Sequence, residues 1–136
     1  MTRRPFPLAV PAELRPYILD FHWDLELLHG LDLPTVSLQV ADLADHLDLP
    51  FWAYDGRPFQ VTPHQVAAAP VRYQEQYART LAAELGHPLD VVRRPDDRVT
   101  ILDGVHRLLR AELEGRMTVA VRVLPWSELD RIAVPV

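Results

Sequence analysis

The sequence predicts a single α+β domain over residues 1–136. Residues 34–40 alternate apolar with polar side chains and residues 117–123 place valines at every second position, as half-buried strands do. Residues 105–113 carry apolar side chains at helical spacing. The chain has 136 residues and is 49% hydrophobic, which is sufficient for one domain with its own core.

The composition excludes several classes of protein. The chain contains no cysteine, so it has no disulfide framework, no thiolate zinc site and no cysteine nucleophile. The net charge of -5 argues against a sequence-independent DNA-binding surface, which needs a basic stripe. No apolar run approaches the length that crosses a membrane, and residues 1–5 are not followed by a signal-peptide core. We therefore expect a soluble, cytoplasmic protein without a membrane or nucleic-acid partner.

Residues 1–33 are expected to form an N-terminal arm and a first strand. Four prolines within residues 5–16 predict irregular structure. Residues 21–27 alternate and favour a strand, although a helix also fits. On such a strand His22, Asp24 and Glu26 share one face. A face of this kind is far more often solvated than metal-binding, so we expect no metal site there.

Residues 34–136 are expected to form the core of the domain. After the strand over residues 34–40, residues 41–47 have the spacing of a short helix. Asp55-Gly56 predicts a tight hairpin between residues 51–54 and 57–61. The aromatic residues of this hairpin serve either as core or, less commonly, as a stacking surface for a base.

Two helices are predicted after the hairpin. Thr62 as N-cap and Pro63 at the first helical position begin a helix that extends to Ala69. A longer helix over residues 71–85 follows, and its buried stripe is expected to consist of Tyr73, Tyr77, Leu81 and Leu85. Arg79 and Thr80 lie off that stripe, and Arg79 is also spaced to pair with Glu75 one turn earlier.

The C-terminal half continues with a hairpin, a helix and a strand. Residues 89–93 and 98–102 flank the turn Pro95-Asp96-Asp97, and the second strand leads directly into the helix that begins near Gly104. Beyond the strand over residues 117–123, Ser127 and Asp130 resemble a capping box that begins a short helix over residues 128–132.

The turn Asp103-Gly104-Val105-His106-Arg107 is the strongest candidate for a binding site. A strand that passes into a helix through a tight turn directs backbone N–H groups and the positive end of the helix dipole at one spot, which favours a phosphate. Gly104 permits close approach, and His106 and Arg107 bring donors and positive charge. The alternative is structural: Asp103 is an N-cap, and His106 and Arg107 lie on the solvated side of the helix.

Residues 72–124 resemble the ParB/sulfiredoxin superfamily. The resemblance rests on the Asp-Gly-x-His-Arg turn between a strand and a helix, on Gly115 and the strand after it, and on the helix and Pro-containing strand before the turn. It implies a small mixed sheet with helices packed on it and a turn that binds the phosphates of a nucleotide. Sulfiredoxin carries its catalytic cysteine where this chain has Val105, so sulfiredoxin activity is excluded.

The leading functional hypothesis is therefore a domain that binds a nucleotide or another phosphorylated ligand. The resemblance implies a nucleoside triphosphate or diphosphate with magnesium, and phosphoryl transfer or nucleotide hydrolysis if the domain is catalytic. The alternatives are a non-catalytic module with a protein partner or a homodimer and, with least support, DNA binding or cleavage. The predicted phosphate-binding residues are Asp103, Gly104, His106, Arg107, Thr80 and Arg79.

Overall fold

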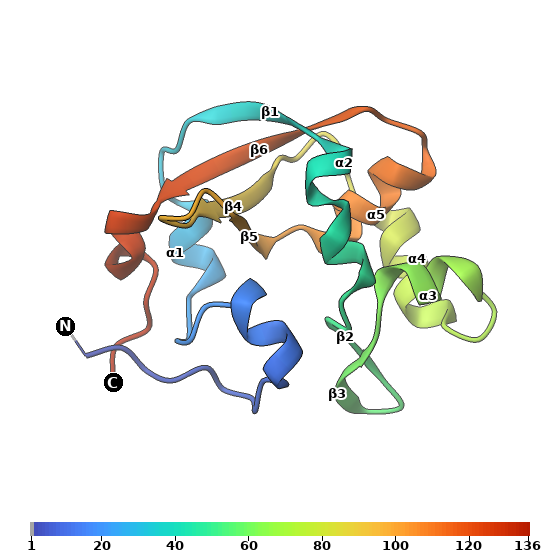
Figure 1. Ribbon diagram of the computed structural model, residues 1–136, viewed down its shortest axis with the longest axis horizontal. Helices are drawn as coiled ribbons and strands as arrows, with labels where there is room; N and C mark the ends of the chain where they lie inside the picture. The colour runs from blue at the N-terminus through green and yellow to red at the C-terminus, as the bar shows by residue number, and fades with distance from the viewer. Residues whose placement is uncertain (1) are drawn as a thin grey trace.

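Four strands form a mixed sheet in the order β1-β6-β4-β5. The computed structural model describes residues 2–136 (Figure 1). Strands β4 and β6 are parallel, and the other neighbouring pairs are antiparallel. This arrangement confirms an α+β fold with a small mixed sheet. The strands are β1 (Thr35–Gln39), β4 (Leu89–Arg93), β5 (Val99–Asp103) and β6 (Thr118–Pro125).

The parallel pairing of β4 and β6 follows from the helix between β5 and β6. Strand β5 returns antiparallel along β4, and α5 (Val105–Leu113) then carries the chain back so that β6 runs beside β4 in the same direction. Both faces of the sheet are covered, so four of the five residues of β4 are buried. Alternate residues of this strand therefore face two different cores.

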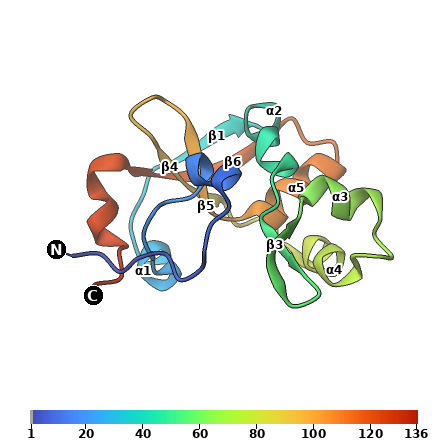
Figure 2. The same cartoon turned by 60° about the horizontal axis from the view of Figure 1, so that its bottom comes forward.

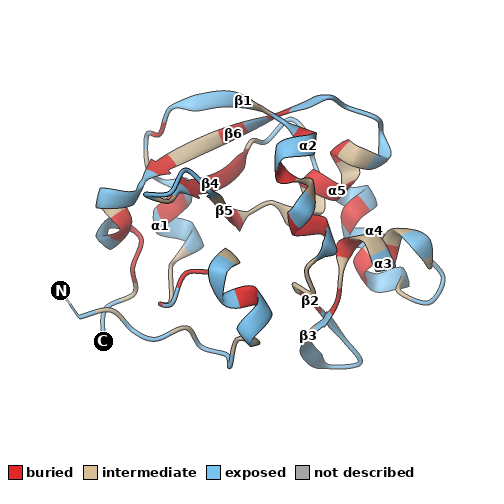
Figure 3. Cartoon of the chain, viewed as in Figure 1, coloured by how far each residue is buried: buried red, intermediate tan, exposed pale blue. Residues whose placement is uncertain are grey.

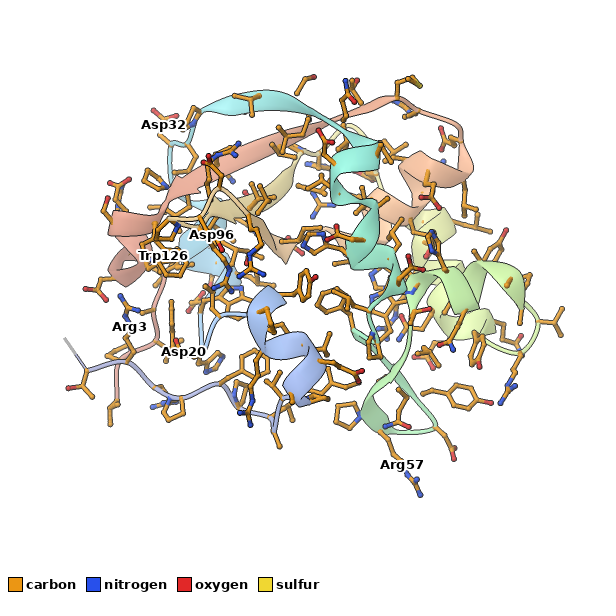
Figure 4. All side chains as sticks on the ribbon, viewed as in Figure 1. Arg3, Asp20, Asp32, Arg57, Asp96 and Trp126 are labelled. Atoms are coloured by element: carbon orange, nitrogen blue, oxygen red, sulfur yellow. The ribbon has the colours of Figure 1, made fainter. Side chains whose placement is uncertain are left out.

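Helices α2 (Val40–Leu43), α3 (Pro63–Ala68), α4 (Gln74–Ala82) and α5 cover one face together with a two-stranded hairpin (Figure 1). The hairpin consists of β2 (Trp52–Tyr54) and β3 (Arg57–Val61), and Arg57 points outward from its tip (Figure 4). Buried residues concentrate on the inner sides of these elements and on the central strands (Figure 3). A 3-10 helix, η2 (Ala44–Asp48), continues α2.

The N-terminal segment and the C-terminal 3-10 helix cover the other face. The N-terminal segment contains η1 (Ala12–Tyr17) and α1 (Leu25–His29), and the C-terminal helix is η3 (Trp126–Arg131). Leu28, Leu102 and Ile132 belong to the core on this face. The two termini lie at the end of the molecule opposite α3 and α4 (Figures 1 and 2). Within residues 2–136, no helix is long and apolar enough to cross a membrane.

The predicted strand over residues 21–27 is wrong, and the helical alternative is correct for its second half. Phe21 and Trp23 form only isolated bridges, and α1 begins at Leu25. Asp24 accepts hydrogen bonds from the amides of Glu26 and Leu27, at 2.8 and 3.1 Å. This N-cap stabilises a helix start, and it outweighs the alternating pattern.

The predicted stripe on the helix before Gly86 is wrong in part. Helix α4 is shorter than expected, and Leu81 is 53% exposed. Gln76 and Thr80 are buried instead, because each finds a hydrogen-bond partner inside: Gln76 donates to the carbonyl of Ala53 and Thr80 donates to that of Gln76. These hydrogen bonds therefore allow α4 to bury the face that carries Gln76 and Thr80, in place of the face that hydrophobic residues alone predict.

Of three further local predictions, two are confirmed and one is wrong. The hairpin at Asp55-Gly56 is confirmed, and Thr62 begins α3 with a complete capping box to Gln65. The capping box predicted at Ser127 does not form, because η3 begins after Pro125 as a 3-10 helix without a side-chain cap in the described chain.

His64 joins three elements through hydrogen bonds to two carboxylates. Its Nδ1 lies 2.6 Å from Asp48 and its Nε2 lies 2.7 Å from Glu112. Burial lowers the pKa of His64, but the two carboxylates outweigh burial and raise it above 6.5. A raised pKa stabilises the folded state below pH 6.5, and this stabilisation is lost as the pH rises through the folded-state pKa.

The substitution His64→Gln should therefore destabilise the protein by about 1 kcal/mol at pH 6 and by much less at pH 8.5. Urea unfolding at both pH values measures the difference. His87→Gln is the matched control, because His87 is exposed and pairs with one carboxylate of its own segment. Equal losses at both pH values for His64→Gln would contradict the charged bridge.

Candidate functional site

Gly104 forms the turn between β5 and α5. It is the N-cap residue of α5 with φ +117°, a backbone conformation that residues with a side chain rarely adopt. A Cβ at this position would lie 2.8 Å from Cγ of Leu89. Glycine is therefore required both by the backbone conformation and by the close packing of the turn on β4.

The first turn of α5 presents unbonded backbone N–H groups. No side chain of residues 2–136 caps it, and the first backbone bond runs from Leu108 N–H to Gly104 O at 2.9 Å. The amides of Val105, His106 and Arg107 therefore precede the helical hydrogen-bond ladder. Together with the helix dipole they contribute partial positive charge at this end of α5.

Arg107 is held in place beside these amides. Its guanidinium donates to the carbonyl of Pro88 and, at 3.1 Å, to Oδ2 of Asp103. The side chain is 17% exposed, so it does not lie on a solvated helix face. Asp103 in turn does not act as an N-cap, because it is the last residue of β5 and its carboxylate faces Arg107 and His29.

A groove of about 620 Å³, which we name the α5 groove, lies beside the turn. It opens where β4 begins and β5 ends, and it combines acidic, basic and imidazole side chains. Its lining residues are His29, Ala82, Glu84, His87, Pro88, Asp90, Asp103, Arg107 and Arg122.

The register of the sheet brings two aspartates together in this groove. Asp90 on β4 is opposite Asp103 on β5, next to an irregularity in the pairing, and opposite Arg122 on β6. Like charges directly opposite each other in a sheet are destabilising. Two cations offset this repulsion, since Arg122 lies beside Asp90 and Arg107 lies beside Asp103.

Asp90 is the most unusual residue of the groove. It is 2% exposed, and Nη1 of Arg122 lies 3.1 Å from its Oδ1 without making a hydrogen bond to it. Arg122 donates instead to the carbonyl of Leu31. Burial raises the pKa of Asp90, and the charges of Arg122 and His29 counteract this only in part.

His29 completes a cluster with the two aspartates. Its Nε2 lies 2.8 Å from Oδ2 of Asp103 and 3.6 Å from Oδ2 of Asp90. One nitrogen and two carboxylate oxygens are thus within 4.8 Å of one another. Sequence reasoning did not single out His29 or Asp90. The available signal was a charged residue at position 90 between the apolar residues 89 and 91 of a buried strand.

His106 does not contribute to the α5 groove. Its ring stacks on Trp52, with 4.1 Å between ring centroids and 11° between the planes, and its Nε2 lies 2.8 Å from Oε1 of Gln76. Burial lowers the pKa of His106 to about 4, with a further contribution from the charge of Arg79. The ring is therefore neutral at pH 7 and brings no positive charge to the turn.

Thr80 and Arg79 also lie elsewhere. Thr80 is fully buried. Arg79 pairs with Glu75 at 3.1 Å, as the structural alternative expected, and lines a second groove of about 350 Å³. This second groove, named the Tyr54 groove, also contains Tyr73 and Arg72. Trp52 belongs to the core, whereas Tyr54 is partly exposed and packs edge-to-face on Tyr73.

Asp103 and Arg107 of the predicted site thus line the α5 groove, with Gly104 in the turn between them, whereas Thr80, Arg79 and the ring of His106 lie elsewhere. Comparisons with protein-family models, curated proteins and solved structures found no match for this chain. Function is therefore inferred from the geometry of the two grooves.

Proposed function

We propose that the chain binds a phosphorylated small ligand of the nucleotide class in the α5 groove. The observation that carries this proposal is the start of α5, where the first amides have no helical partner and Arg107 of the same turn lines a groove. The resemblance to the ParB/sulfiredoxin superfamily points to the same turn. Magnesium accompanies the nucleotide in this proposal, and phosphoryl transfer or nucleotide hydrolysis is the associated reaction class.

The local geometry supports phosphate binding in three ways. The amides of residues 105–107 supply donors, because they precede the helical hydrogen-bond ladder of α5. Arg107 supplies a planar guanidinium suited to phosphate oxygens. The groove volume of about 620 Å³ falls in the range of small-molecule sites.

The hydrogen bond between Arg107 and Asp103 sets the condition for binding. A phosphate that engages Arg107 must share the guanidinium with Asp103, whose carboxylate repels it. A divalent cation bound with the nucleotide removes this repulsion. We therefore expect binding to require magnesium or a similar ion.

Calorimetric titration with ATP, ADP, CTP and GTP in the presence of MgCl₂ tests the proposal. Arg107→Ala should weaken binding at least tenfold, because a hydrogen bond to a charged group contributes about 1.5 to 3 kcal/mol. Arg79→Ala is the matched control, since it removes the same charge from the Tyr54 groove. Its affinity should stay within about twofold of the native value.

Three outcomes would contradict this proposal. Titrations without heat for every nucleotide would favour the protein-interaction module. Loss of binding in Arg79→Ala and not in Arg107→Ala would place the ligand in the Tyr54 groove. Native affinity in Arg107→Ala would show that the phosphate contact does not depend on Arg107.

A further inference from the structure

We propose that His29, Asp90 and Asp103 bind a divalent first-row metal ion in the α5 groove. This inference deepens the proposed function, and the coupling to phosphate described below rests on that function. Binding of the ion by itself does not depend on the proposed function. The three proposed ligands come from separate parts of the chain: the end of α1, the start of β4 and the end of β5.

The donor atoms already have nearly the spacing that one ion requires. Nε2 of His29 and one oxygen from each aspartate lie within 4.8 Å of one another. Ligands at about 2.1 Å from a common ion are at most about 4.2 Å apart, so small side-chain rotations suffice. Both aspartates extend from paired strands, which keeps the two carboxylates at this spacing.

The state of Asp90 independently indicates a ligand. Its side chain is 3% exposed, and its buried Oδ1 has no hydrogen-bond partner in the described chain. An ionised carboxylate is costly to bury unless its oxygens are bonded. The neighbouring residues of β4 are apolar, and the guanidinium of Arg122 lies beside Oδ1 of Asp90 only. The other oxygen, Oδ2, lies 3.6 Å from Nε2 of His29 and is the atom that a metal ion in the groove would bind.

The donor set indicates which ions fit. One imidazole nitrogen with two carboxylate oxygens suits Mn²⁺, Fe²⁺ or Zn²⁺ better than Ca²⁺, which prefers oxygen ligands only. We choose Mn²⁺ as the probe because its paramagnetism reports which histidine lies beside it.

The charges of the groove couple the ion to a phosphorylated ligand. Arg107 and Arg122 already neutralise the two aspartates, so a divalent ion leaves two excess positive charges. A phosphate dianion would balance them. The ion would also replace the N–H of Arg107 on Oδ2 of Asp103 and so release the guanidinium for the phosphate. We expect each ligand to raise the affinity of the other by roughly 5- to 100-fold.

The first experiment uses Mn²⁺ alone, without nucleotide. Electron paramagnetic resonance should count one Mn²⁺ bound per chain, and Asp90→Asn and His29→Gln should each weaken binding at least tenfold. His87→Gln is the control, because His87 lines the same groove outside the cluster. Native affinity in Asp90→Asn or in His29→Gln, or Mn²⁺ binding that His87→Gln abolishes, would overturn the site.

A second measurement on the unaltered protein does not depend on the folding of a variant. Substoichiometric Mn²⁺ should broaden the imidazole NMR signals of His29 first. Broadening of His64, which also lies between two carboxylates, in place of His29 would overturn the proposal.

The two proposals fail separately. Mn²⁺ binding at His29 with flat nucleotide titrations rejects the proposed function and retains the metal site. Magnesium-dependent nucleotide binding that depends on Arg107, together with no binding of Mn²⁺ to the protein alone, rejects the metal site and retains the proposed function.

Discussion

Gly104→Ala is expected to destabilise the protein by about 3 kcal/mol, the sum of backbone strain and overpacking. The φ angle of +117° is unfavourable for alanine, and the new methyl group would lie 2.8 Å from Cγ and 3.3 Å from Cα of Leu89. Leu89 is fully buried and cannot move aside. Urea unfolding of the variant measures the loss.

Gly115→Ala is the matched control for this substitution. Gly115 also has a positive φ, of +70°, but a Cβ there meets no atom within 4 Å. Its loss should be about 1 kcal/mol, from backbone strain alone. Equal losses in the two variants would show that the packing of the turn on β4 is not as tight as the structure indicates.

The second prediction with a large expected effect is that the folded protein loses stability in acid because of His106. Burial lowers the pKa of His106 to about 4, below the ordinary value of 6.5. The unfolded chain therefore takes up this proton at a higher pH than the folded chain does. The stabilising contribution is present above pH 6.5 and is lost as the pH falls toward 4.

With allowance for partial exposure, this contribution amounts to about 2 kcal/mol. His106→Gln retains a donor for Gln76 and removes the titrating group. The stability difference between native protein and variant should therefore shrink as the pH falls from 7 to 4.5, when both are unfolded with urea. A constant difference, or an NMR titration that places the pKa of His106 near 6.5, would contradict the account.

Local signals in the sequence predicted much of the fold. The hairpin at Asp55-Gly56, the helix start at Thr62 and the turn at Gly104 each depend on residues within one short segment. The helix before Gly86 was misjudged in part because Gln76 bonds to Ala53 and His106, which are distant in sequence. The periodic pattern of hydrophobic residues does not reveal tertiary hydrogen bonds of this kind.

The candidate site was only half predictable for the same reason. Gly104 and Arg107 belong to one turn, so their motif was visible. His29, Asp90 and Asp103 meet only through the pairing of β4 with β5 and the packing of α1 beside them. Spacing along the chain carries no information on such a cluster. The role of Arg107 likewise depends on its hydrogen bonds to Pro88 and Asp103, which the sequence does not reveal.

The central claim is that the start of α5 holds a phosphate. An amide NMR titration with magnesium pyrophosphate, which carries no base, tests this claim most directly. The account predicts saturable shifts that are largest at the amides of Gly104, Val105, His106 and Arg107, with no comparable change at Tyr54. Shifts centred on the Tyr54 groove, or none at the turn at millimolar pyrophosphate, would contradict it.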